Sequence, residues 1–201
     1  MPLLLSILRD RTKVNLLKRL FGGDFIHGGF LRRNAIEFGI RLLGVASDEV
    51  KEVLIEVLRD DPYFEVRAMA AKALGEFMEP SDELETQLGE ALDDRYPEVV
   101  IEVIGALGAL ARRPEVVQQL ERFYLHESWQ IRWQVVVVLA RLLERGVVDL
   151  EKVAASADQI LATSPFFEPQ FPLKQQLEAL VQQLARASAA QKASHRQAAE
   201  Q

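Results

Sequence analysis

Apolar residues recur along this chain at spacings of three and four, which is the period of an amphipathic helix. Acidic residues open several of these segments, as Asp48-Glu49 do for the segment that runs to about Arg59. Pro or Gly marks the breaks between segments, for example at Pro62, Pro80 and Gly146. No segment has a convincing alternating pattern of a strand, so the sequence predicts an all-α protein.

The helical pattern repeats. Residues 66–77 (VRAMAAKALGEF) align with 99–110 (VVIEVIGALGAL) and with 131–142 (IRWQVVVVLARL). Residues 31–42 fit upstream, and residues 173–184 fit more weakly downstream, with successive offsets of 35, 33, 32 and 42 residues. Repetition at about this period is typical of stacked helical hairpins. The sequence therefore predicts five hairpins, each with an outer helix followed by an inner helix.

Residues 61–75 (DPYFEVRAMAAKALG) resemble a HEAT-like repeat of the bacterial type that also occurs in phycobilin lyases. The third repeat departs from the pattern with Val100 in place of arginine, and the fourth has Glu127-Ser128 in place of Asp-Pro. The resemblance implies an α-solenoid, an α-α superhelix of about five hairpins over residues 1–187, followed by an Ala/Gln-rich tail at 188–201. The inner helices are expected near residues 31–43, 64–78, 98–111, 129–145 and 172–186.

The second repeat is unusually rich in small residues, with Ala70, Ala71, Ala73 and Gly75 in one helix. A single hairpin buries too little apolar surface to offset the entropy of ordering its chain, so it must stack on its neighbours. Small side chains let helix backbones approach closely, whereas glycine in an unpacked helix only destabilises it. These residues therefore predict close packing between successive hairpins.

Three arginines share one position in the repeat: Arg32, Arg67 and Arg132, with Lys174 at the same place in the last repeat. A basic group there can pair with an acid at a preceding turn, and Asp60, Asp61, Asp93 and Asp94 are the candidates. We interpret the three as a structural ladder that keeps the repeats aligned. A row of ligand-binding arginines is the alternative.

Charge is distributed unevenly along the chain. Residues 1–43 carry a net charge of +5, residues 44–100 carry −11, and the rest balances to give −6 overall. Because proteins that coat nucleic acid normally present a basic face, this distribution argues against a nucleic-acid partner. The basic first third is interpreted as solvated helix faces, with a local binding site as the alternative.

Residue types that carry chemistry are scarce. The chain has no cysteine, and its three histidines lie far apart, so no metal site is expected. Residues 21–30 (FGGDFIHGGF) lack the Lys-Ser/Thr end of a phosphate-binding loop. We expect them to form a flexible link, with a ligand-holding loop around Asp24 and His27 as the alternative. The sequence gives no catalytic residue and no cofactor, and it predicts a protein that is not an enzyme.

Trp129 and Trp133 lie four residues apart on one predicted helix and flank Arg132. We expect Trp129 to pack into the core and Trp133 to lie on the inner face. Tryptophans and an arginine also occur in helical-repeat DNA glycosylases, but a catalytic aspartate in a matching motif is missing here. The positions that the repeat leaves variable define the expected inner face, and the partner-binding candidates on it are Met69, Lys72, Glu102, Trp133, Gln134, Val137 and Arg141.

An inner face with apolar positions rimmed by charges favours a non-enzymatic scaffold or adaptor that binds another protein. Alternatives are a bilin-handling or chaperone subunit similar to the phycobilin lyases, and a regulatory module of a larger enzyme. No apolar run is long enough to cross a membrane and the N-terminus lacks the pattern of a secretory signal, so we expect a cytoplasmic protein. The leucine-rich residues 3–8 suggest weak self-association through the N-terminal helix.

Overall fold

The computed structural model describes residues 2–10, 24–41, 44, 46–163 and 172–199. Within these ranges every regular element is a helix and no strand is present, so the all-α prediction is confirmed. The chain divides into two compact units, Met1–Leu110 and Ala111–Gln201. The expectation of one repeat domain over residues 1–187 remains a prediction.

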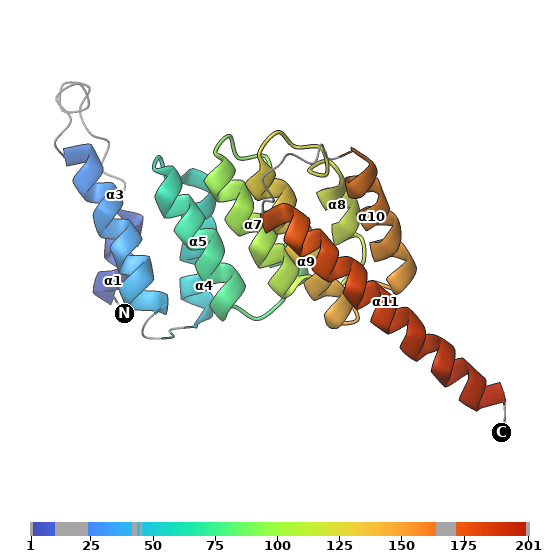
Figure 1. The fold of residues 1–201 in the computed structure, drawn as a ribbon. Coiled ribbons are helices and arrows are strands. Elements are labelled where there is room, and N and C mark those ends of the chain that lie inside the picture. Colours follow the sequence, from blue (N-terminus) through green and yellow to red (C-terminus); the bar gives the residue numbers. More distant parts are fainter. Residues whose placement is uncertain (1, 11–23, 42–43, 45, 164–171, 200–201) are drawn as a thin grey trace. The chain divides into compact units, whose positions relative to one another are not determined.

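The first unit is built from pairs of packed helices. Helix α4 packs on α5 and α6 packs on α7, while α5 also lies beside both α7 and the π-helix η1 (Figure 1). The second helix of one pair therefore neighbours the second helix of the next. The described elements are α1 (Pro2–Arg9), α3 (Asp24–Asn34), η1 (Ala35–Arg41), α4 (Asp48–Asp60), α5 (Phe64–Phe77), α6 (Asp82–Ala91) and α7 (Pro97–Leu110).

Local sequence explains where these helices begin. The hydroxyl of Ser47 accepts a hydrogen bond from the Val50 N–H at 3.3 Å, and acidic residues fill the first turn of α4. Ser81 caps α6 in the same way by accepting from the Leu84 N–H at 3.2 Å. Helix α7 begins at Pro97, where a missing N–H costs nothing because the first turn has no acceptor for it.

The small residues of α5 lie where the helix meets its neighbours. Ala70, Ala71 and Ala73 have no exposed surface. A Cβ atom at Gly75 would lie 2.7 Å from the Cα atom of Ala106 on α7, so only glycine fits without a shift of the backbone. The close packing predicted from these residues is therefore present between α5 and α7.

The beginning of the chain differs from expectation. The expected flexible link at residues 21–30 is wrong for its described part, because Gly28 and Gly29 lie inside α3. The α-helix expected at 31–43 starts earlier, at Asp24, and its α-helical part ends at Asn34. Residues 35–41 continue it as a π-helix, which has a wider turn. A glycine is required at position 29 because a Cβ atom there would lie 2.9 Å from the ring of Tyr63.

The second unit contains α8 (Val116–Glu121), α9 (Trp129–Glu144), α10 (Leu150–Thr163) and α11 (Pro172–Ala199) among the described residues. Helices α9, α10 and α11 pack on one another, and their core includes Ile131, Leu139 and Leu180. The later part of α11 projects away from α9 and α10 (Figure 1). The backbone shows no boundary at residue 187, because α11 continues as one helix to Ala199.

Candidate functional site

Charged side chains from three neighbouring helices of the first unit meet on one surface. Arg41 at the end of η1 forms two hydrogen bonds to the carboxylate of Glu76 on α5, from Nε at 2.5 Å and from a terminal nitrogen at 3.0 Å. Arg41 also pairs with Glu37 one turn earlier. Two charges on α5 and α7, Lys72 and Glu102, complete what we call the charge cluster: Glu37, Arg41, Lys72, Glu76 and Glu102.

Glu102 is the carboxyl of the cluster whose charged form is disfavoured by its surroundings. Burial raises the pKa of this half-buried carboxyl above its usual value, and the negative charge of Glu76 adds to the effect. Lys72 and Arg41 act in the opposite direction and lower that pKa. Glu102 therefore lies within electrostatic reach of two other helices, and the nearby positive charges compensate it only in part.

Exposed apolar side chains accompany this surface on the N-terminal elements. Phe38, one turn before Arg41, is 60 % exposed, and Leu31, two turns earlier, is 56 % exposed. On α1, Leu5 and Leu8 are buried whereas Leu3 is 75 % exposed. An exposed aromatic side chain beside charged groups is a common feature of protein-binding surfaces. Self-association through α1 remains a prediction.

The partner-binding candidates on α5 and α7 are only partly buried. Met69 and Lys72 on α5 and Glu102 on α7 are each intermediate in exposure, next to fully buried neighbours such as Ala70 and Val103. The structure thus brings Lys72 and Glu102 into one cluster. Arg41 and Phe38 were missed from the sequence, although the 35 residues that separate Arg41 from Glu76 equal the first repeat offset and could have indicated the pair.

The remaining candidates lie on α9 in the second unit. Trp133, Gln134 and Val137 are partly exposed and Arg141 is exposed, while Val135 and Leu139 between them are buried. These residues therefore form an accessible surface of α9. Trp129, which we expected to pack into the core, is 37 % exposed and stands at the first position of α9.

Two of the three repeated arginines pair with aspartates. Nε and a terminal nitrogen of Arg32 donate to the two carboxylate oxygens of Asp61 at 2.6 and 3.1 Å. Arg67 binds Asp94 in the same way at 2.7 and 3.0 Å, and it also donates to the Asp61 carbonyl at 2.7 Å. Both pairs are largely buried, and together they form a continuous series from Arg32 to Asp94.

The pKa of Asp94 shows the strength of this pairing. Burial alone would raise that pKa, but hydrogen bonds from Arg67 and from the Tyr96 N–H, together with the Arg67 charge, lower it below the usual value. The aromatic ring of Tyr96 also stacks on Phe64 with ring centroids 4.6 Å apart. Charge and ring stacking therefore tie the start of α5 to the turn before α7.

Arg132 has a different environment. One of its terminal nitrogens donates to the backbone carbonyls of His126 and Glu127. Its Nε is buried and has no hydrogen-bond partner in the part of the chain that the structure describes. Among the described residues, the hydrogen bonds of Arg132 thus go to the backbone of the adjacent turn, where Glu127-Ser128 stands in place of Asp-Pro.

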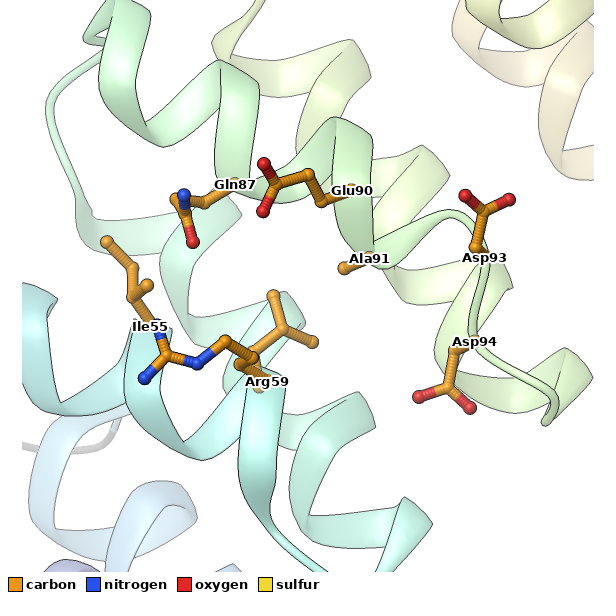
Figure 2. A pocket seen from close by; sticks show the side chains of 8 residues that line it. Ile55, Arg59, Gln87, Glu90, Ala91, Asp93 and Asp94 are labelled. Carbon is orange, nitrogen blue, oxygen red and sulfur yellow. The ribbon is translucent and has the colours of Figure 1, made fainter.

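A small cavity lies between α4 and α6 in the first unit. Figure 2 shows Ile55 and Arg59 on α4 facing Gln87 and Glu90 on α6. Its volume is about 200 Å³, which is below the range of about 300–1,000 Å³ that is typical of small-molecule sites. Its polar groups are also engaged elsewhere, since Arg59 pairs with Asp60 and Asp94 binds Arg67. The remaining lining residues are Leu58, Ala91 and Asp93.

In the described ranges, no group of three or more His, Cys, Asp or Glu side chains is placed to hold a metal ion. None of the helices described here combines the length and the apolar character that crossing a membrane requires. Compared with protein-family models and with curated proteins, the chain shows no match. The function must therefore be inferred from the surfaces themselves.

Proposed function

We propose that the chain is an α-solenoid of about five HEAT-like hairpins that acts as a non-enzymatic scaffold. It binds a partner protein on the face formed by the second helices of the hairpins. The fold part of this proposal is supported by the packing of α5 beside both η1 and α7, and by arginine–aspartate pairs that recur one repeat apart. We place the protein in the cytoplasm. The chain has no cysteine and therefore no disulfide bond that would require an oxidising compartment.

The charge cluster is the observation that carries the binding part of the proposal. It combines three carboxylates with two basic groups, and it includes the half-buried Glu102, whose charge is already partly removed from water. Part of the free energy needed to desolvate the Glu102 carboxylate has therefore already been spent in folding, before a partner binds. A partner that brings a basic side chain to Glu102 would gain from that preorganisation.

Phe38 supplies the apolar part of the same surface. Its side chain is 60 % exposed within one turn of Arg41, so a partner could cover it without any rearrangement of the core. Aromatic anchors of this kind often contribute a large share of binding energy. The partner is therefore proposed to be a protein segment with both basic and apolar side chains, and the −11 charge of residues 44–100 would speed its association.

The test is to isolate the partner from native lysate with the full chain and then to measure its dissociation constant as a purified protein. Phe38→Ala with Glu102→Gln should weaken binding at least about tenfold and leave helicity unchanged. The matched control is Leu125→Ala with Glu52→Gln, which also removes one exposed apolar side chain and one carboxylate. Equal binding by both double variants would refute the proposed surface.

The α9 candidates are tested with Trp133→Ala and Val137→Glu. Loss of partner binding with intact circular dichroism would extend the binding surface to α9. Unfolding would show that these side chains belong to the core. Addition of a bilin to the wild-type chain tests the tetrapyrrole alternative, since a specific complex would shift the visible absorbance of the pigment.

A further inference from the structure

Large apolar side chains lie exposed along α3 and η1 in the first unit. Phe30 is 42 % exposed, Leu31 is 56 % exposed and Phe38 is 60 % exposed. Asn34, which is also exposed, lies four residues after Phe30 and four before Phe38. Because residues three or four apart share one side of a helix, these residues form a continuous surface, and we call it the α3–η1 stripe: Phe30, Leu31, Asn34 and Phe38.

The residues of α7 that align with this stripe are buried. Leu31 aligns with Val99 and Phe38 aligns with Ala106, and both α7 residues are almost completely covered. Ala106 lies where α7 meets α5, next to Gly75. In the first helix pair, by contrast, the contacts of α3 and η1 with α1 and α5 leave Leu31 and Phe38 exposed. The stripe is therefore a packing surface of the repeated helices that stays accessible in the part of the chain that the structure describes.

The order of side chains along the stripe is the same in both directions. Apolar side chains flank Asn34 on either side, with Phe30 and Leu31 before it and Phe38 after it. Two copies of the stripe that cross antiparallel at their centres would therefore place Phe38 of each copy against Phe30 and Leu31 of the other. The two Asn34 side chains would meet at the crossing point, and one such polar pair fixes the register of an apolar contact between helices.

Two charged residues beside the stripe follow the same symmetry. Arg33 precedes the centre of the stripe and Glu37 follows it, and both side chains are partly exposed. In the antiparallel arrangement Arg33 of each copy would lie beside Glu37 of the other, so each copy supplies the charge that the other one needs. Glu37 pairs with Arg41 within the chain, and Arg41 would keep Glu76 as its second partner. A surface that complements itself in this way is the kind that two-fold symmetric dimers use.

We infer that the α3–η1 stripe is the contact surface of a homodimer, in which the stripes of two copies pack antiparallel about a two-fold axis at Asn34. The inference goes beyond the proposed scaffold function and does not involve Glu102. The exposed apolar side chains offer an area of about 300 Å² per copy, given about 150–250 Å² for each large side chain. Because stable interfaces bury about 800 Å² per partner, the dimer should be weak and should form only in concentrated solution. Phe38 belongs to both surfaces, so a second copy and a partner protein would compete for it.

The first experiment measures the sedimentation of the full-length chain from low to high micromolar concentration, where the average mass should rise from that of one copy towards that of two. Leu31→Glu places a charge in the contact and should raise the dissociation constant of the dimer at least about tenfold. Leu125→Glu changes a leucine of the second unit that is 66 % exposed, and it should leave the dissociation constant unchanged. Leu3→Glu tests a contact through α1 in the same way. Circular dichroism checks that each variant keeps its helicity.

Charge reversal tests the antiparallel arrangement. Arg33→Glu alone and Glu37→Arg alone should each weaken the dimer, because two pairs of like charges would then face each other. An equimolar mixture of these two variants should recover the dimer, since every facing pair is again of opposite sign. Mixing would not repair damage to the fold of a single chain, so recovery reports on the contact itself.

Three results would overturn the inference: a wild-type chain that stays monomeric at high micromolar concentration, a dimer that Leu31→Glu leaves intact, or a dimer that only Leu3→Glu disrupts. A mixture of the charge-reversal variants that stays monomeric would overturn the antiparallel arrangement. The scaffold function is judged separately, by the binding of its partner to Glu102→Gln, a variant that should dimerise as the wild-type chain does. Either proposal can therefore fail while the other holds.

Discussion

Helix α5 meets α7 and η1 in different ways. Against α7 its backbone comes so close that Gly75 cannot carry a Cβ without a contact of 2.7 Å to Ala106, and the buried Arg67–Asp94 pair lies at the same junction. Against η1 the contact includes the partly exposed pair of Glu76 with Arg41. A junction packed through backbone tolerates little change, whereas an ion pair in contact with water can rearrange. The α5–α7 side therefore sets the geometry of the first unit, and the η1 side leaves charges available for binding.

The largest effect is expected from Asp94→Ala. This change leaves the Arg67 guanidinium buried without its carboxylate, and it should reduce the free energy of unfolding by about 2–4 kcal/mol. Urea denaturation at pH 7 measures the loss. The matched variant is Asp93→Ala, which removes a neighbouring carboxylate that is exposed. A loss no greater than that of Asp93→Ala would mean that the buried pair does not hold this junction.

The same pair gives a pH dependence of known sign. Because the pKa of Asp94 is lowered in the folded protein, its contribution to stability is present above the unfolded value of about 4 and is lost as the pH falls through the folded value. The difference between the wild-type chain and Asp94→Ala should therefore shrink between pH 5 and pH 3, as estimated from these reference values. Unfolding curves at a series of pH values would contradict the assignment if that difference stayed constant.

Overpacking of α5 should have the next largest effect. Ala70 is completely buried, so Ala70→Leu adds three carbon atoms to a site without space and should cost about 1–3 kcal/mol. Ala68 on the same helix is partly exposed, and Ala68→Leu is the matched control with an expected cost below about 0.5 kcal/mol. Equal denaturation midpoints for the two variants would show that the small residues of α5 do not mark a packed junction.

A single methyl group probes the same junction more gently. Gly75→Ala gains about 1 kcal/mol of helix propensity but forces the α5 and α7 backbones apart, so we expect a net loss of about 1 kcal/mol. Gly39→Ala is the comparison, since the atoms nearest to its Cβ would be those at the end of the Leu4 side chain, which can rotate. Thermal unfolding should show the greater loss of stability for Gly75→Ala. The reverse order would mean that η1 packs more tightly against Leu4 of α1 than α5 packs against α7.

These junctions differ in how far the sequence could predict them. Helices α5, α7 and α9 lie within one residue of the ranges expected from apolar spacing, because that spacing depends only on local geometry. The small residues of α5 also predicted close packing, since alanine and glycine leave space that only a neighbour can fill. Asp61 and Asp94 were among the four candidate partners of the repeated arginines, and only the fold could select them.

Other features could not be read from the sequence. Glycine pairs usually indicate a link between helices, but Gly28 and Gly29 lie within α3, where the ring of Tyr63 occupies the space of a side chain. The π-helix that follows has no local signature that the apolar spacing would reveal. Trp129 is 37 % exposed at the first position of α9, although we expected it to pack into the core. The close approach of Tyr63 to Gly29 is a contact between residues far apart in the chain, which spacing along one helix does not encode.

The smallest effect is expected on the other side of α5, from Glu76→Gln. The Arg41 side chain is 20 % exposed and that of Glu76 is 37 % exposed, so water screens their attraction. Arg41 also keeps its second partner, Glu37. The loss should be about 0.5 kcal/mol at low ionic strength and should vanish near 1 M salt, where charges are screened over about 3 Å. Urea denaturation at the two salt concentrations measures it, with Glu79→Gln, an exposed carboxylate after α5, as the control. A loss as large as that of Asp94→Ala, persisting in high salt, would mean that charge rather than close packing holds α5 on both sides.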